Sequence, residues 1–158
     1  MSQLITCLWF DGQAEEAAAH YAAIFPCSSV GTTTRYGPGM PGPEGEVMTV
    51  AFTLDGAEFV GLNGGPQFTF SEAISFQILC DDQAAVDHCW ERLGDGGEEG
   101  PCGWLKDRFG VSWQVVPRVL IETVQGPDRD AAQRTMQAML EMGRLDVAAL
   151  ERAAAGEG

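Results

Sequence analysis

Positive charge is the scarcest property of this sequence of 158 residues. Nine Lys and Arg residues stand against 23 Asp and Glu residues, which gives a formal net charge of −14 at pH 7. DNA, RNA and anionic membranes are recognised by positively charged surfaces. The composition therefore argues against nucleic acid and membrane as partners, and solubility is sufficient to explain the excess of negative charge.

Long apolar runs and paired cysteine motifs are also missing. No stretch approaches the roughly 20 consecutive apolar residues of a membrane-spanning helix, and the first residues lack the basic-then-apolar pattern of a signal peptide. The five cysteines are odd in number and form no CxxC motif, which favours a reducing compartment over a disulfide scaffold. We therefore expect a cytoplasmic protein of one domain, large enough to bury a core.

Histidine is rare as well, since the sequence has only His20 and His88. Both fall inside predicted helices, where a position on the solvent side is expected. Neither is placed to activate Cys7 or Cys102 as a nucleophile, which would need a base or a positive field nearby. No Ser-His-Asp arrangement, dinucleotide fingerprint or phosphate loop is present.

Residues 102–117 are the most informative stretch. Two short runs of strand-favouring residues flank the segment 107–110, whose last residue, Gly110, can supply the positive φ of a tight hairpin loop. Side chains alternate along the second run, so Ser112 and Gln114 lie on one face. A glutamine between valines is expected to face water or a cavity instead of the core.

A degenerate repeat organises the rest of the chain. Asp11-Gly12-Gln13-Ala14 and Asp81-Asp82-Gln83-Ala84 both follow a predicted strand and open a predicted helix, 70 positions apart. Each half then continues with about three strands, which predicts an α+β protein with a duplicated unit. Strands are predicted over 4–10, 28–36, 47–54, 57–63, 74–80 and in the hairpin, and helices over 14–25, 82–93, 130–142 and 146–154. Strand 4–10 is apolar throughout and is expected to be buried on both faces.

Two segments carry a family resemblance. The opening Cys7–Ala17 and the hairpin Cys102–Pro117 resemble the signatures of the PhnB-like, or 3-demethylubiquinone-9 3-methyltransferase domain, family of the vicinal-oxygen-chelate (glyoxalase, bleomycin resistance and dioxygenase) superfamily. The tail from Met136 to Leu150 also fits, so the resemblance extends over nearly the whole chain.

That resemblance implies paired βαβββ modules that form a curved mixed sheet cup, followed by a C-terminal helical extension. The expected division of the single domain is 1–66, 67–118 and 119–158. Asp146 is the expected N-cap of the last helix. Family members are expected to be homodimers, and the Met-rich tail is expected to form core or dimer contacts.

Metal-dependent members of the superfamily bind their ion with His and Glu or Gln side chains of the inner strands. The resemblance assigns these positions to Thr6 or Cys7, to Ser75 or Phe76, and to Gln114. None of them is a histidine, and a neutral glutamine beside hydroxyl groups holds a divalent ion only weakly. We therefore expect no tightly bound metal and no other cofactor.

Polar side chains on otherwise apolar strands form the candidate ligand site. They either hydrogen-bond to one another or line a pocket for a small organic ligand. The candidates are Thr6, Cys7, Ser75, Gln77, Cys102, Trp104 and Gln114, and Ser112 belongs to the same polar set. Lys106, the only lysine, lies on the same side of its strand as Trp104 and is either a base, an anion contact or an exposed residue at the strand end.

The leading hypothesis is a small-molecule binding protein, or a metal-independent enzyme, of the PhnB-like type. Its ligand is unknown. One alternative is a divalent-metal lyase, isomerase or dioxygenase whose site is completed by loop 37–46 or by a partner chain. Another is a sequestration or resistance protein that binds an aromatic or electrophilic compound beside Trp9, Trp104 and Trp113. No motif for S-adenosylmethionine supports the methyltransferase name.

Overall fold

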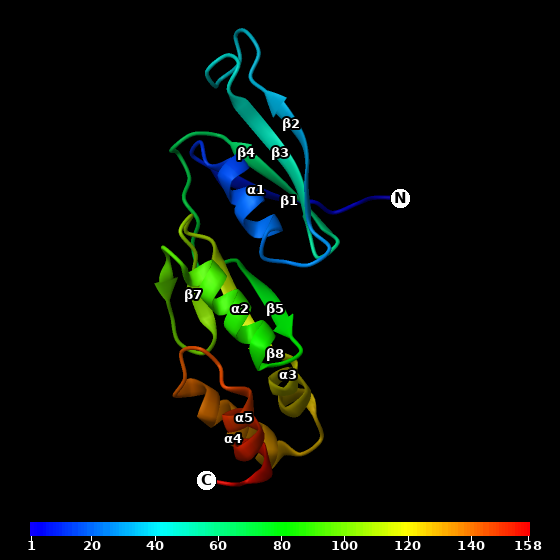
Figure 1. Cartoon of the computed structure of the whole chain (residues 1–158), viewed down its shortest axis with the longest axis vertical. Helices are drawn as coiled ribbons and strands as arrows, with labels where there is room; N and C mark the ends of the chain where they lie inside the picture. Colours follow the sequence, from blue (N-terminus) through cyan, green and yellow to red (C-terminus); the bar gives the residue numbers. More distant parts are fainter. The chain divides into compact units, whose positions relative to one another are not determined.

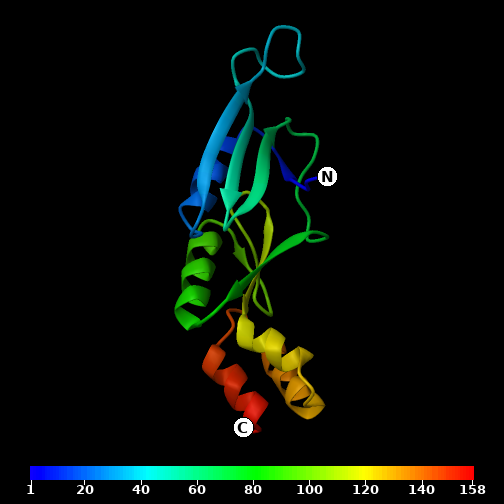
Figure 2. The same cartoon turned by 90° about the vertical axis from the view of Figure 1, so that its right-hand side faces the viewer.

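The computed structural model describes residues Met1–Gly158 and divides into two compact units, Met1–Phe70 and Ser71–Gly158. Each unit contains one four-stranded mixed sheet with a helix packed on one face, and the second unit carries three further helices (Figures 1 and 2). The predicted α+β class with two βαβββ modules and C-terminal helices is confirmed.

The first unit follows the order strand, helix, three strands. Its sheet has the strand order β1-β4-β3-β2, with β1 parallel to β4 and the other neighbours antiparallel. The elements are β1 (Thr6–Phe10), α1 (Ala14–Ala22), β2 (Ser29–Arg35), β3 (Val47–Leu54) and β4 (Ala57–Asn63).

The second unit repeats this topology. Its sheet has the equivalent order β5-β8-β7-β6, with β5 parallel to β8 and the other neighbours antiparallel. The elements are β5 (Ser75–Cys80), α2 (Gln83–Gly94), β6 (Glu98–Glu99), β7 (Trp104–Lys106) and β8 (Ser112–Pro117). The two copies of Asp-x-Gln-Ala thus lie at the same strand-to-helix turn, which confirms the internal repeat.

One face of each sheet is covered by its helix. In the first unit, Tyr21 of α1 is fully buried with Val50 and Phe52 of β3, whereas on β1 only Leu8 and Phe10 are buried. The expectation that strand 4–10 is buried on both faces is therefore wrong. An unbroken apolar run is compatible with single-sided packing, because alternate residues of β1 point away from the helix.

The boundary between the units lies after Phe70, four residues beyond the division expected from the sequence. Phe68 packs edge-on against Trp9 with ring centroids 4.9 Å apart, and Phe70 packs similarly on Phe10 at 5.3 Å. The Trp9 indole also donates to the carbonyl of Gly65 at 2.9 Å. These aromatic contacts hold the segment after β4 on the first unit.

Carboxylates cap three of the helices. Asp82, Asp128 and Asp146 accept hydrogen bonds of 2.8–3.0 Å from backbone N–H groups three residues further on, which satisfies donors that a helix leaves free. The predicted cap at Asp146 is confirmed. The N–H of Ala14 in α1 is instead capped by the side chain of Asn63 at 2.9 Å.

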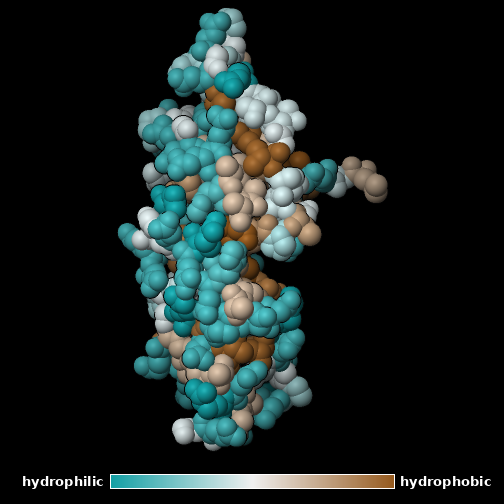
Figure 3. Space-filling model, in the orientation of Figure 1, coloured by the Kyte–Doolittle hydropathy of each residue, from teal (hydrophilic) through white to brown (hydrophobic).

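The C-terminal extension consists of α3 (Arg118–Gln125), α4 (Arg129–Leu140) and α5 (Val147–Ala155). Sequence analysis assigned no element to α3, whose β-branched residues lower helix propensity. Tertiary packing stabilises the helix at this place, because Leu120 is buried in a cluster with Val116, Leu145 and Leu150. None of the helices is both long and apolar enough to span a membrane, and the face shown in Figure 3 is mostly hydrophilic.

The connection between β7 and β8 is built around one buried carboxylate. Asp107 is 3% exposed, and its Oδ1 accepts from the N–H groups of Phe109 and Val111 at 2.9 and 3.0 Å. Its Oδ2 accepts from the indole of Trp113 at 2.9 Å. Gly110 has φ 89°, which confirms the predicted positive-φ position. Asp107 therefore fixes both the loop and the principal aromatic residue of β8.

Replacement of Asp107 by Ala should lower the free energy of unfolding by about 3 kcal/mol or more. Two buried donors, the N–H of Val111 and the indole of Trp113, and the partly buried N–H of Phe109 lose their acceptor, and each buried donor costs about 1–3 kcal/mol. Urea unfolding followed by circular dichroism measures the change. Asp95→Ala is the control, because Asp95 forms only an exposed pair with Arg108, and a cost below about 1 kcal/mol is expected. Equal losses for the two variants would contradict the assigned role of Asp107.

Candidate functional site

The sheet of the second unit has one face free of helix α2. We call this the open face. The alternation of side chains along each strand and the register between the strands place six side chains on it: Ser75, Gln77, Trp104, Lys106, Ser112 and Gln114. The opposite face contributes Leu105, Trp113 and Val115 to the core. The open face is thus the polar side of an otherwise apolar sheet.

Three of the predicted residues form a hydrogen-bonded chain on the open face. The side-chain amide of Gln114 donates to Ser75 Oγ at 2.9 Å, and Gln77 donates to Gln114 Oε1 at 3.5 Å. Trp104 lies opposite Gln114 in the pairing of β7 and β8. Some of the predicted polar residues therefore satisfy one another, and their neighbours line a pocket.

The pocket on this face has a volume of about 400 Å³. We call it the open-face pocket. The predicted residues Cys102 and Trp104 line it, together with Lys106 and Ser112, and Glu72, Glu98 and Glu99 also border it. The carboxylate of Glu99 lies on the helix-covered face of the sheet, where it accepts from the indole of Trp90 at 2.8 Å. Its size falls within the range of about 300–1,000 Å³ that is usual for small-molecule sites.

Ser112 is the unusual residue of the open-face pocket. The residue is 2% exposed, and its hydroxyl has no hydrogen-bond partner. Its neighbour Ser75, paired with it across the strands, has a partner in Gln114. A buried hydroxyl without a partner costs about 1–3 kcal/mol, so native proteins seldom keep one without a reason.

Lys106 and Glu72 form an ion pair beside Ser112, with Nζ and Oε1 separated by 2.6 Å. The hydrogen bond to Glu72 raises the pKa of Lys106, and the same bond lowers the pKa of Glu72. Lys106 is therefore held in its protonated form, which does not suit the role of a general base. Lys106 thus serves as the partner of a carboxylate in its own chain, a role that the sequence analysis did not name.

Cys102 is positioned by the C-terminal extension. Its backbone has φ 58°, an uncommon value for a residue with a side chain, and its N–H donates to the carbonyl of Met142 at 2.7 Å. The next N–H, of Gly103, donates to Gly143 at 2.8 Å. A side chain at Gly103 would meet the carbonyl of Val115 at 2.7 Å, so glycine is required there. The segment between α4 and α5 thus supports one wall of the open-face pocket.

The remaining candidates, Thr6 and Cys7, belong to the first unit. They are consecutive on β1, so Cys7 points away from the face that carries Leu8 and Phe10. Partial burial raises the pKa of the Cys7 thiol, which makes it a poor nucleophile at neutral pH. Within one unit, the structure therefore groups five of the seven predicted residues, Ser75, Gln77, Cys102, Trp104 and Gln114.

Sequence analysis missed the carboxylates around the pocket. Glu72 precedes β5, and Glu98 and Glu99 form the two-residue strand β6, in a segment predicted as loop. No periodicity marks so short a strand. Of the histidines, His88 is exposed as expected, whereas His20 is half-buried with its Nε2 shielded.

The positions that the superfamily uses for metal do not fit a metal site in this chain. Gln114, at the position of the usual carboxylate, is committed to Ser75 and Gln77. Ser75 and Cys7 bring neither imidazole nor carboxylate. No group of three or more His, Cys, Asp or Glu side chains in the chain is arranged to hold an ion.

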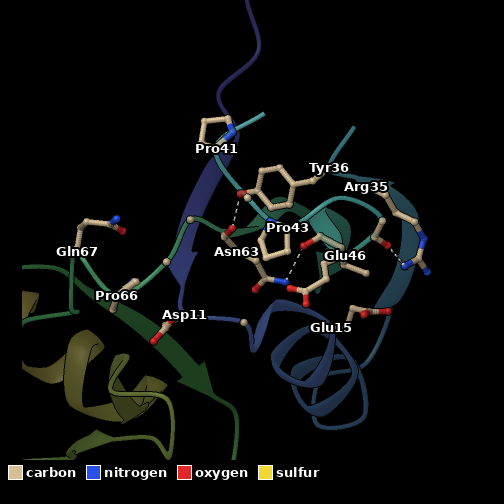
Figure 4. A pocket seen from close by; sticks show the side chains of 16 residues that line it. Asp11, Glu15, Arg35, Tyr36, Pro41, Pro43, Glu46, Asn63, Pro66 and Gln67 are labelled. Atoms are coloured by element: carbon tan, nitrogen blue, oxygen red, sulfur yellow. Dashed lines mark hydrogen bonds between the residues drawn. The ribbon is translucent and has the colours of Figure 1, made fainter. Parts of the chain in front are cut away.

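A larger cavity of about 620 Å³ lies in the first unit beside loop 37–46 (Figure 4). Three of its polar side chains have partners within the chain: Tyr36 donates to the carbonyl of Asn63 at 2.5 Å, and Arg35 donates to that of Gly45 at 2.9 Å. The side chain of Asn63 binds Val47 and caps α1. This cavity contains no predicted site residue, and neither of the buried side-chain polar atoms without a partner belongs to a residue that lines it, so the open-face pocket is the candidate site.

The chain is similar to one described protein family and to several solved structures. The 3-demethylubiquinone-9 3-methyltransferase family matches residues 2–116. A PhnB protein from Bacillus cereus, described as a 3-demethylubiquinone-9 3-methyltransferase, is 33% identical, with a TM-score of 0.65 over 73% of this chain and 99% of its own. Protein PA1353 from Pseudomonas aeruginosa shares the fold at 20% identity, with a TM-score of 0.61 over 74% and 98% of the two chains. A search of the curated proteins finds no match.

The matched span corrects one expectation. The resemblance was expected to extend through the tail to Leu150, but the family match ends at 116, immediately before α3. The helical extension that supports Cys102 therefore lies outside the family match.

Ser112→Ala should raise the free energy of unfolding of the ligand-free protein by about 1 kcal/mol, because it removes a buried hydroxyl that has no partner. The matched variant Ser75→Ala removes a hydroxyl that is hydrogen-bonded and should cost about 1 kcal/mol. Urea unfolding of both variants measures the difference. A loss of stability in Ser112→Ala equal to that in Ser75→Ala would show that the Ser112 hydroxyl is satisfied.

The ion pair should be visible in the titration of Glu72. Because its folded-state pKa lies below the usual 4.5, the contribution of the pair to stability is present above that value and is lost as the pH falls through the lowered pKa. For Lys106, the contribution is lost as the pH rises through the raised pKa. In an NMR titration, Lys106→Met should raise the pKa of Glu72. An unchanged Glu72 would contradict the pairing.

Proposed function

This chain belongs to the 3-demethylubiquinone-9 3-methyltransferase (PhnB-like) family, and we propose that its open-face pocket binds a small organic ligand with an aromatic ring, without a divalent metal. The function is binding, and any chemistry is limited to what the pocket residues themselves provide. The homodimer and the cytoplasmic location expected from the sequence remain predictions.

The observation that carries the proposal is the hydroxyl of Ser112. It is buried, it lacks a partner, and it lines a pocket of about 400 Å³. A ligand that hydrogen-bonds to Ser112 would remove the free-energy cost of this unsatisfied group. A polar ligand would therefore bind more favourably here than beside a polar group that already has a partner.

Trp104 indicates the character of the ligand. Its half-buried indole lines the same pocket and lies on the strand next to Ser112. Aromatic side chains offer a large apolar surface that pairs with flat rings and contributes about 0.5–1.5 kcal/mol beyond burial. A ligand that combines a ring with a polar group at one end matches this pair of residues.

Methyl transfer is not part of the proposal. The family name refers to that reaction, but the sequence contains no motif for S-adenosylmethionine. Lys106 is protonated in its pair with Glu72, and both histidines lie outside the pocket. Sequestration of an aromatic compound is the role that these residues serve best.

Tyrosol, a neutral phenol with a hydroxyethyl chain, is the probe that tests the proposal. Titrated into ¹⁵N-labelled protein, it should shift the amide resonances of Trp104, Lys106 and Ser112, with and without EDTA. Trp104→Ala should abolish the shifts and Trp104→Phe should retain most of them. If tyrosol leaves these resonances unchanged up to its solubility limit, the proposal is wrong. Binding that EDTA abolishes and added Mn²⁺ restores would favour the metal-dependent alternative.

A further inference from the structure

We propose that Gln83 is a positioning residue of the open-face pocket, because it holds the connection between α4 and α5 against the wall of that pocket. Ligand binding and the docking of this connection are then coupled. The inference rests on the proposed function, since it takes the open-face pocket as the ligand site. Gln83 does not line the pocket itself and acts on it through other residues.

Gln83 makes two hydrogen bonds to the backbone at the start of α5. Its side-chain oxygen accepts from the N–H of Val147 at 2.8 Å, and its side-chain nitrogen donates to the carbonyl of Leu145 at 3.2 Å. The N–H of Val147 is one of the donors that the first turn of a helix leaves free. A single side chain of α2 thus fixes the backbone of the connection with both a donor and an acceptor.

Carboxylates of α2 reinforce this contact. The guanidinium of Arg144 lies 3.2 Å from Asp87 Oδ1 and 3.1 Å from Glu91 Oε1. Gln83 donates to the same Asp87 oxygen at 3.0 Å, and this hydrogen bond is the main cause that lowers the pKa of Asp87. Ion pairs that are partly exposed contribute little alone, so Gln83 is the principal anchor of the connection.

The connection is packed on the turn that forms the pocket wall. Leu145 is fully buried, and a Cβ atom at Gly103 would lie 3.0 Å from its Cδ1. The N–H groups of Cys102 and Gly103 donate to carbonyls of the connection at 2.7 and 2.8 Å. Both of these donors are used by the connection and not by the sheet, so the position of the wall depends on the connection.

A ligand in the pocket would contact this wall directly. Cys102 and Trp104 both line the pocket, and Gly103 between them carries the contact with Leu145. A wall released from the connection loses the fixed shape that a preformed site requires. A ligand that needs this shape therefore stabilises the docked connection by the same factor by which docking raises the affinity for the ligand.

The first unit provides a matched comparison for Gln83. Gln13 holds the same place in the repeated Asp-x-Gln-Ala, but it is exposed and its side chain caps no helix. The extension follows the last residue of the family match, 116. The role of Gln83 is therefore assigned to the second unit, which has an extension to hold.

Hydrogen exchange of backbone amides tests the positioning. Gln83→Leu should accelerate the exchange of the Cys102 and Gly103 amides about tenfold or more, although the hydrogen bonds of Gln83 go to other residues. The Val111 amide, which Asp107 holds in the same unit, should exchange at its original rate and reports on general destabilisation.

Ligand affinity should change together with these exchange rates. Gln83→Leu should weaken tyrosol binding about fivefold or more, because the free energy of docking is coupled to that of binding. The matched variant Gln13→Leu makes the same substitution in the first repeat. It should alter neither the tyrosol affinity nor the exchange rates.

The coupling is also measurable without any substitution. Saturating tyrosol should slow the exchange of the Val147 amide, which lies outside the pocket. Ala14 is the reference, because its N–H also opens a helix and donates to a side-chain amide oxygen, that of Asn63 at 2.9 Å. Tyrosol should leave the exchange of the Ala14 amide unchanged.

The outcomes separate the inference from the function on which it rests. If tyrosol binds but neither slows the exchange at Val147 nor binds more weakly to Gln83→Leu, the positioning role is wrong and the proposed function stands. If tyrosol perturbs neither Trp104 nor Ser112 in the original chain, the proposed function is wrong and the coupling falls with it. Exchange at Val111 that accelerates as much as that of the pocket wall in Gln83→Leu would show a general loss of stability and would also overturn the inference.

Discussion

The buried carboxylate of Asp107 is the interaction on which the second unit depends. It accepts three hydrogen bonds within seven residues of chain, two from the loop backbone and one from Trp113. A carboxylate this deeply buried is tolerated only when its lone pairs are engaged. Because it fixes the loop and the aromatic ring together, the register of β7 against β8 follows, and with it the face on which Trp104, Lys106 and Ser112 lie.

Duplication explains why a single sheet face is available for function. Each unit needs one helix to bury one face of its sheet, and α1 and α2 do this with the same topology. The other face of each sheet is then free to diverge in its residues. In the second unit it has acquired the hydrogen-bonded chain of Ser75, Gln77 and Gln114 and the pocket beside it. The helical extension reinforces this unit through Cys102 and Gly103.

Features that depend on neighbouring residues could be predicted from the sequence, and features that depend on contacts between distant residues could not. Gly110 and Asp146 were predictable, because a positive φ and a helix cap depend on a few neighbouring residues. Alternation along β8 placed Ser112 and Gln114 on one face for the same reason. The helix α3 was not predictable, since Leu120 is helical through its contact with residues up to 30 positions away, such as Leu145 and Leu150. Neither was the meeting of Glu72 and Glu98 at the pocket, because 26 residues separate them in the chain.

The unsatisfied hydroxyl of Ser112 and the satisfied carboxylate of Asp107 belong to the same hairpin and have opposite consequences. Both are polar groups that are almost fully buried. Every donor that faces Asp107 improves the stability of the free protein, so its partners are part of the fold. The Ser112 hydroxyl has no partner within the chain and is therefore expected to lower the stability of the free protein. A rigid hairpin that already has its internal hydrogen bonds can hold such a group without collapsing around it, which is the condition for a preformed binding site.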